Sequence, residues 1–152
     1  MAATVLAVSG CTPPARKDNR IMAAQGERVE CGSLVFNVLE SVWLAQLGEL
    51  PMARMPKHRF LKIRLSVTNG GGTVAGCPMQ TLLDANDNSY PEMNDVTGVE
   101  EWLGMVRMLQ PGETSIGWIV FDVPQKSYTL RLTDGLIENE HVGYVKIPYS
   151  IE

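Results

Sequence analysis

One ten-residue segment alternates between apolar and polar side chains, and this pattern constrains the fold more than any other feature of the chain. In residues 59–68 (RFLKIRLSVT), one face of an extended chain would carry Leu61, Ile63, Leu65 and Val67, and the other Lys62, Arg64, Ser66 and Thr68. A period of two indicates a β-strand with one face in a core and the other in water. The run Asn69-Gly70-Gly71-Gly72 then ends the strand in a turn.

Five further segments carry strand signals. Residues 114–123 are apolar on both alternating faces, which indicates a central strand with Trp118 as a core anchor. Residues 127–133 and 143–151 alternate as 59–68 does, and Pro148 favours a sheet edge for the last of them. Residues 79–83 and 89–93 flank the turn-forming run DANDN and predict a hairpin.

The segment 33–44 fits two patterns. Alternation at Phe36, Val38, Val42 and Leu44 suits a strand, whereas Val35, Val38, Leu39 and Val42 also form a helical stripe. We predict a strand because the neighbouring segments are strands. With 152 residues and 23 Gly and Pro residues (14 and 9) between the apolar runs, the chain is expected to form one all-β domain. We predict an immunoglobulin-like antiparallel β-sandwich of about seven or eight strands.

The N-terminus resembles a bacterial export signal. A short apolar run ends in Val8-Ser9-Gly10-Cys11, the pattern of a lipobox, in which the cysteine receives a diacylglycerol. We therefore expect a signal or lipobox remnant at residues 1–11, a flexible polar tether at 12–30 and the sandwich at 31–152, exported and lipid-anchored at the bacterial cell envelope. No basic residue precedes Cys11, so this interpretation requires a longer natural start. The alternative is a chance cysteine.

If Cys11 carries lipid, Cys31 and Cys77 remain as a pair in an oxidising compartment. Each is adjacent to a glycine at an expected strand end, where a cross-link is sterically easy. The pattern predicts a Cys31–Cys77 disulfide, with two buried or idle thiols as the alternative.

Several short motifs, in their order along the chain, resemble a known family. They are Val67-Thr68-Asn69, Leu82-Leu83-Asp84 with Tyr90, Leu109-Gln110-Pro111-Gly112-Glu113, Val120-Phe121-Asp122-Val123-Pro124 and Leu130-Arg131-Leu132. Together they resemble the immunoglobulin-like domain of uncharacterised function found in bacterial surface lipoproteins, related to the mycobacterial immunoprotective extracellular antigen. The resemblance covers roughly Gly32 to Gly135. It implies a sandwich fold and a surface location, and it implies no catalytic residue.

Two groups of residues are candidate metal ligands. Asp84 and Asn86 open the DANDN run with oxygen donors at alternate positions, as in a calcium loop, but an EF-hand loop needs Gly at its sixth and Glu at its twelfth place, which here hold Ser89 and Asp95. The alternative is a hairpin turn.

The second candidate set is Met52, Met55 and His58, whose Met-x-x-Met-x-x-His spacing offers soft ligands for Cu(I). Against copper, methionine also fills irregular gaps under loops, and Pro51 and Pro56 disrupt the helix that this spacing assumes. A periplasmic copper-binding protein is therefore the alternative function.

Catalysis and nucleic-acid binding are both disfavoured. The net charge is −4 and the isoelectric point about 5.2, so no general field attracts phosphates. The two histidines, His58 and His141, lie in no nucleophile motif. We expect a non-catalytic module without cofactor that binds a protein or envelope partner and meets the membrane only through its N-terminal lipid.

Overall fold

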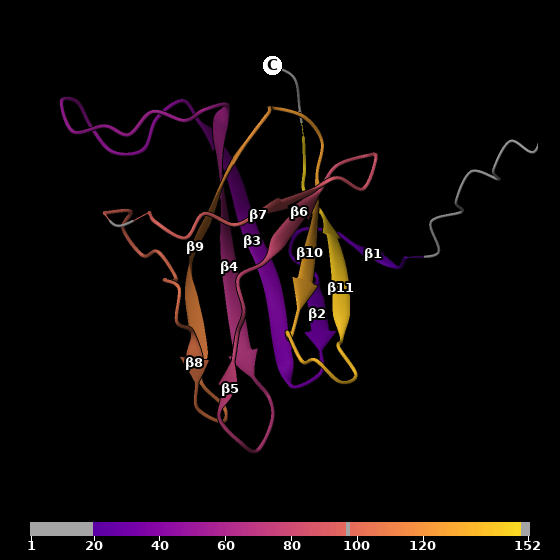
Figure 1. Ribbon diagram of the computed structural model, residues 1–152. Coiled ribbons are helices and arrows are strands. Elements are labelled where there is room, and N and C mark those ends of the chain that lie inside the picture. The colour runs from indigo at the N-terminus through magenta and orange to yellow at the C-terminus, as the bar shows by residue number, and fades with distance from the viewer. Residues whose placement is uncertain (1–19, 97, 150–152) are drawn as a thin grey trace, which may run out of the picture.

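The computed structural model describes residues 20–96 and 98–149, and in these ranges the chain forms strands and turns without helices (Figure 1). No helix of the described residues is therefore long and apolar enough to cross a membrane. The strands are β1 (Met22–Ala23), β2 (Arg28–Cys31), β3 (Leu34–Leu44), β4 (Arg59–Asn69), β5 (Ala75–Gly76), β6 (Thr81–Leu83), β7 (Ser89–Pro91), β8 (Met108–Leu109), β9 (Thr114–Val123), β10 (Thr129–Thr133) and β11 (Val142–Lys146).

Two main sheets form a sandwich. One sheet has the order β2-β3-β4-β9, the other β1-β11-β10-β6-β7, and β5 pairs with β8 alone. All strand pairs are antiparallel except β1 with β11. Eight strands have three or more residues. The predicted all-β sandwich is thus confirmed.

The core lies between the inner faces of the two sheets. The predicted apolar face of β4 is fully buried there, as are Phe36 of β3, Phe121 of β9 and Leu130 of β10. Apolar burial of this kind is the main favourable term in folding. Trp118 differs from the expectation that it anchors the core, because it is only partly buried and stacks under Lys62, whose Nζ lies 4.3 Å from the ring centroid.

A β-bulge explains why residues 33–44 fit two patterns. The pairing of β3 with β4 shifts by one residue between Val38 and Glu40. Val38 is buried in the core, and beyond the shift Trp43 packs against the same core, whereas Val42 is exposed. The strand prediction is correct, but Val42 does not share a face with Val38, because a bulge inserts one residue and reverses the alternation.

Part of the segment expected to be a tether belongs to the sandwich. Within residues 20–30, β1 pairs with β11 through Met22 and Ala23, and β2 pairs with β3 from Arg28 onward. β11 is therefore an interior strand, contrary to the edge position suggested by Pro148.

A second, smaller apolar cluster covers the outer face of the β4–β9 pair. Phe60 and Val120 are buried beneath Leu47 and Val96. The chain from Glu101 to Leu103 closes over β9 through Trp118 N–H to Glu101 O (2.8 Å) and Leu103 N–H to Trp118 O (3.1 Å). This approach requires Gly117, since a Cβ there would lie 2.4 Å from Glu101 O. The cluster forms the base of the candidate site.

Candidate binding site

The loop of residues 45–58, between β3 and β4, has a larger number of exposed large apolar side chains than any other described loop. Leu50, Met52 and Met55 are 77%, 88% and 66% exposed. Figure 1 shows the loop projecting from one end of the sandwich. Scattered exposed apolar residues are normal, but a group of them on one projecting segment is typical of an interaction surface.

Hydrogen bonds hold both ends of this loop. Leu47 and Arg54 exchange two backbone hydrogen bonds of 2.9 and 2.8 Å, and Leu47 is buried. The backbone N–H groups of Lys57 and His58 donate to the Asp122 carboxylate at 2.7 and 2.9 Å. The apolar tip is thus presented by a fixed base.

A hollow of about 270 Å³ lies between this loop and the segment that precedes β8; its lining residues are Leu47, Gly48, Glu49, Met52, Arg54, Val96, Gly98 and Val99. Most of this wall is apolar, and Glu49 and Arg54 add one charge of each sign. The Arg54 guanidinium donates to the backbone carbonyl of Asp95, which links the two sides. A hollow of this size and character suits one or two apolar side chains.

The sequence predicts Met52 as a site residue but not the rest of the wall. Val96 and Val99 come from a stretch without strand or helix periodicity, and Leu47 follows the end of β3. The one sequence signal for these wall residues is that single apolar residues occur near Gly48 and Gly98 in otherwise polar stretches. This pattern indicates structured loops, but it does not indicate which loops lie next to each other.

The family of this chain follows from its sequence. The family described as "Domain of unknown function (DUF4352)" matches residues 23–141, most of the chain. The chain belongs to this family. The match begins at β1, which agrees with the inclusion of β1 and β2 in the sandwich. No curated protein shows significant sequence similarity to the chain.

Solved structures share the fold of this DUF4352 domain. The yjhA protein of Bacillus subtilis has a TM-score of 0.67 at 21% identity, with 84% of this chain and 100% of that one covered. MPT63, a secreted protein of Mycobacterium tuberculosis, has a TM-score of 0.57 at 14% identity, covering 86% and 98%. The B. subtilis ycdA protein, described as an inferred lipoprotein, has a TM-score of 0.61 at 12% identity, covering 82% of this chain and 39% of its own. At these identities the similarity concerns the fold alone.

The structure places the candidate copper ligands of the DUF4352 domain on one exposed loop. Met52 lies on the wall of the hollow, while Met55 and His58 are exposed farther along. Within the described part of the chain, no three His, Cys, Asp or Glu residues lie close enough together to hold a metal. Copper binding by the two methionines and His58 stays a prediction.

The Asp84 carboxylate is engaged by protein donors. Its Oδ1 accepts the backbone N–H groups of Asn86 and Asn88, each at 2.9 Å. Its Oδ2 accepts from the Asn88 side chain (2.9 Å), the Tyr90 hydroxyl (3.2 Å) and Lys126 Nζ (3.0 Å). These contacts, led by the Asn88 side chain, hold the pKa of Asp84 well below its ordinary value. Asn86 donates its backbone N–H to Asp84, and the run connects β6 and β7 as a hairpin. Calcium binding by Asp84 and Asn86 stays a prediction.

The expected Cys31–Cys77 disulfide is corrected by the structure, in which both residues are free and buried. Cys31 Sγ is directed to Leu132 O at 3.8 Å, and Cys77 Sγ to Pro78 O at 3.6 Å. Cys31 ends β2, whereas Cys77 follows β5 in the small two-stranded sheet. Cysteine spacing does not report the geometry that a bond requires. Cys11, the predicted lipidation site, lies outside the described residues.

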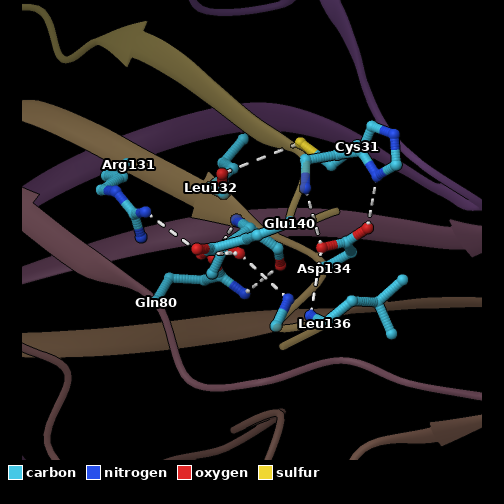
Figure 2. A network of polar contacts seen from close by, with 10 residues as sticks. Cys31, Gln80, Arg131, Leu132, Asp134, Leu136 and Glu140 are labelled. Carbon is cyan, nitrogen blue, oxygen red and sulfur yellow. Dashed lines mark hydrogen bonds and ion pairs between the residues drawn. The ribbon is translucent and has the colours of Figure 1, made fainter. Parts of the chain in front are cut away.

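A polar network surrounds Cys31 at the end of the sandwich opposite the 45–58 loop (Figure 2). The buried Asp134 carboxylate accepts Leu136 N–H at 3.3 Å and His141 N–H at 3.1 Å, and it pairs with His141 Nδ1 at 2.9 Å. Burial, together with the charge of Asp134, raises the pKa of Cys31 to about 11. The thiolate is the reactive form of cysteine, so this environment holds Cys31 unreactive, and Asp134 serves to fix the β10–β11 loop.

Proposed function

We propose that this DUF4352 domain is a non-catalytic binding module that holds a protein or envelope partner on the 45–58 loop. The observation that carries the proposal is the juxtaposition of exposed Leu50, Met52 and Met55 with the adjoining apolar hollow. A partner inserts an apolar side chain into the hollow and covers the methionines. Methionine suits such a surface because its flexible, polarizable side chain adapts to the shape of a ligand.

Substitution of Met52 by aspartate tests this site, because a carboxylate on the hollow wall would be desolvated by the partner. Hot-spot residues, which cluster near the centre of an interface, cost at least about 2 kcal/mol when truncated, roughly a 30-fold loss of affinity, and we assign Met52 this role. We expect Met52→Asp to reduce partner recovery from bacterial membranes at least that much, measured by quantitative mass spectrometry.

The matched control is Met108→Asp, since Met108 is also exposed but lies on β8, away from the loop. Its partner recovery should equal that of the wild type. Equal losses in both variants, or unchanged recovery with Met52→Asp, would remove the 45–58 loop as the binding site.

We also propose that the domain is exported and anchored through Cys11. The lipobox pattern Val8-Ser9-Gly10-Cys11 supports this, and ycdA and MPT63, which share the fold, are described as an inferred lipoprotein and a secreted protein. In cells given a clickable fatty acid, the natural full-length protein should be labelled, and Cys11→Ser should not. Cys77→Ser is the control and should label as the wild type. Labelling of Cys11→Ser, or of neither protein, contradicts the anchor.

A further inference from the structure

β3 continues well past its neighbour β2. β4 pairs with β3 from Leu34 to Leu44, whereas β2 pairs only from Leu34 to Asn37. The next two carbonyls of β3 already accept hydrogen bonds within the domain: Val38 O from Gly26 N–H (2.8 Å) and Leu39 O from the Gln25 side chain (3.2 Å). From Glu40 to Leu44, no described strand pairs with this second edge. Figure 1 shows β3 running beyond β2 toward the 45–58 loop.

A groove runs beside this edge. Its volume is about 340 Å³, and its lining residues are Gln25, Glu40, Ser41, Trp43, Pro148 and Tyr149. The rings of Trp43 and Tyr149 meet edge to face, with centroids 6.5 Å apart. The β3 edge with Trp43 therefore forms one side of the groove, and Pro148 and Tyr149 contribute to the rest of its wall.

Glu40 gives the groove its charge. It is exposed and forms no ion pair among the described residues. Its cross-strand neighbour Arg64 is directed instead to Glu101, at 4.0 Å. The molecule as a whole has a net charge of −4. The complementary ligand is basic at the position that faces Glu40.

We propose that the Glu40–Leu44 edge of β3 accepts an extended segment of a partner protein as an added strand, with a lysine or arginine beside Glu40 and an apolar side chain against Trp43 and Tyr149. An unpaired strand edge offers backbone N–H and C=O groups at the strand spacing, which an extended peptide matches and a globular surface or small molecule does not. Alternation places the basic and the apolar side chains of such a segment on opposite faces. This surface is separate from the 45–58 loop, so either can fail alone.

The probe is the capped seven-residue peptide Val-Thr-Val-Lys-Val-Thr-Val, in which the lysine and the valines lie on opposite faces of the strand. In amide NMR spectra of the full chain, it should shift the signals of Glu40–Leu44. The same peptide N-methylated at alternate amides should not, because it keeps its side chains but cannot pair as a strand. Equal shifts with the methylated peptide, or shifts elsewhere only, overturn the proposal.

Charge reversal tests the role of Glu40. Opposite charges across strands favour pairing and like charges oppose it, so Glu40→Lys should weaken binding of the lysine peptide about threefold to fivefold and favour a glutamate-bearing twin. Glu138→Lys, the same change on the exposed β10–β11 loop, should leave the preference unchanged. Equal effects of the two variants reject the Glu40 contact.

Two other occupants are distinguished by the same samples. A second copy of the chain would give a concentration-dependent sedimentation coefficient that Glu40→Lys abolishes. The chain's own N-terminal segment contains the basic residues Arg16 and Lys17. This segment would be the occupant of the β3 edge if the peptide binds only when both residues are replaced by glutamate. Either result overturns the assignment to a separate partner.

Discussion

Replacement of Arg107 by methionine is expected to lower the free energy of unfolding by about 3–5 kcal/mol, because it leaves a buried carboxylate without its counter-ion. This carboxylate is that of Glu92, which forms an ion pair with the Arg107 guanidinium. The Glu92 side chain is 0% exposed and that of Arg107 3%. The guanidinium also donates to Gly104 O at 2.8 Å, and Glu92 Oε2 accepts Gln80 N–H at 2.8 Å. Urea unfolding monitored by tryptophan fluorescence measures the loss.

The deficit should depend on pH. Burial raises the pKa of Glu92, and Arg107 opposes this rise. In Arg107→Met the opposing charge is gone, so the folded-state pKa lies further above the unfolded value. An acid with a raised folded-state pKa loses stability as the pH rises through that range. The deficit should therefore be smallest below the ordinary glutamate pKa of about 4.5 and largest at neutral pH.

Two controls isolate the buried charge. The double variant Glu92→Gln with Arg107→Met should regain most of the lost stability at pH 7, since no uncompensated charge remains. Arg28→Met breaks an ion pair whose side chains are 67% and 65% exposed, and it should cost less than about 1 kcal/mol. A double variant as unstable as Arg107→Met would show that packing of the arginine, rather than charge, matters.

Gly143→Ala is expected to destabilise the domain at the upper end of the range for overpacking, about 3 kcal/mol. A Cβ at this position of β11 would lie 2.3 Å from Val29 Cγ1 and 3.3 Å from Cys31 Sγ. Valine is stiff about χ1 and cannot turn away freely. Thermal unfolding followed by circular dichroism should give a lower melting temperature with unchanged strand content.

The clash can be relieved from the other side. Val29→Ala removes the methyl group that the new Cβ meets, so Val29→Ala with Gly143→Ala should be more stable than Gly143→Ala alone. Gly72→Ala is the control, because a Cβ at Gly72 has no atom within 4 Å. If the double variant is no more stable, the cost of Gly143→Ala lies in the backbone rather than in this contact.

The strands that the sequence predicts best are those with an unbroken period of two. β9 has the bounds predicted for it, although it is the last strand of its sheet and not a central one, and β4 extends one residue further. β3 is recognisable but its faces are not, because the bulge after Val38 breaks the alternation. β1 has two residues and pairs with β11, more than 100 positions away. No local pattern can indicate such a pairing.

The candidate binding site is less predictable for the same reason. Residues 45–58 contain Met52 and Met55, which their type identifies, but the opposite wall of the hollow comes from Val96, Gly98 and Val99. Glu92 lies near the end of the predicted strand 89–93 and Arg107 in a stretch without a strand signal, and only the fold shows that both charges are buried. From the sequence, Gly117 and Gly143 would be expected to weaken their strands. In the structure, the absence of a side chain at each lets a neighbouring segment approach closely.

The pairing of β1 with β11 has a mechanical consequence for a domain held by its N-terminus. Tension on the chain ahead of Arg20 reaches first the Arg20–Asp87 ion pair and the short β1–β11 ladder, which contains two residue pairs. β2, the next segment, pairs with β3 over four residues. We therefore expect β1 to dissociate from β11 at low force while the two-sheet core stays folded. The N-terminal segment ahead of β2 would then become longer by a few residues without unfolding of the domain.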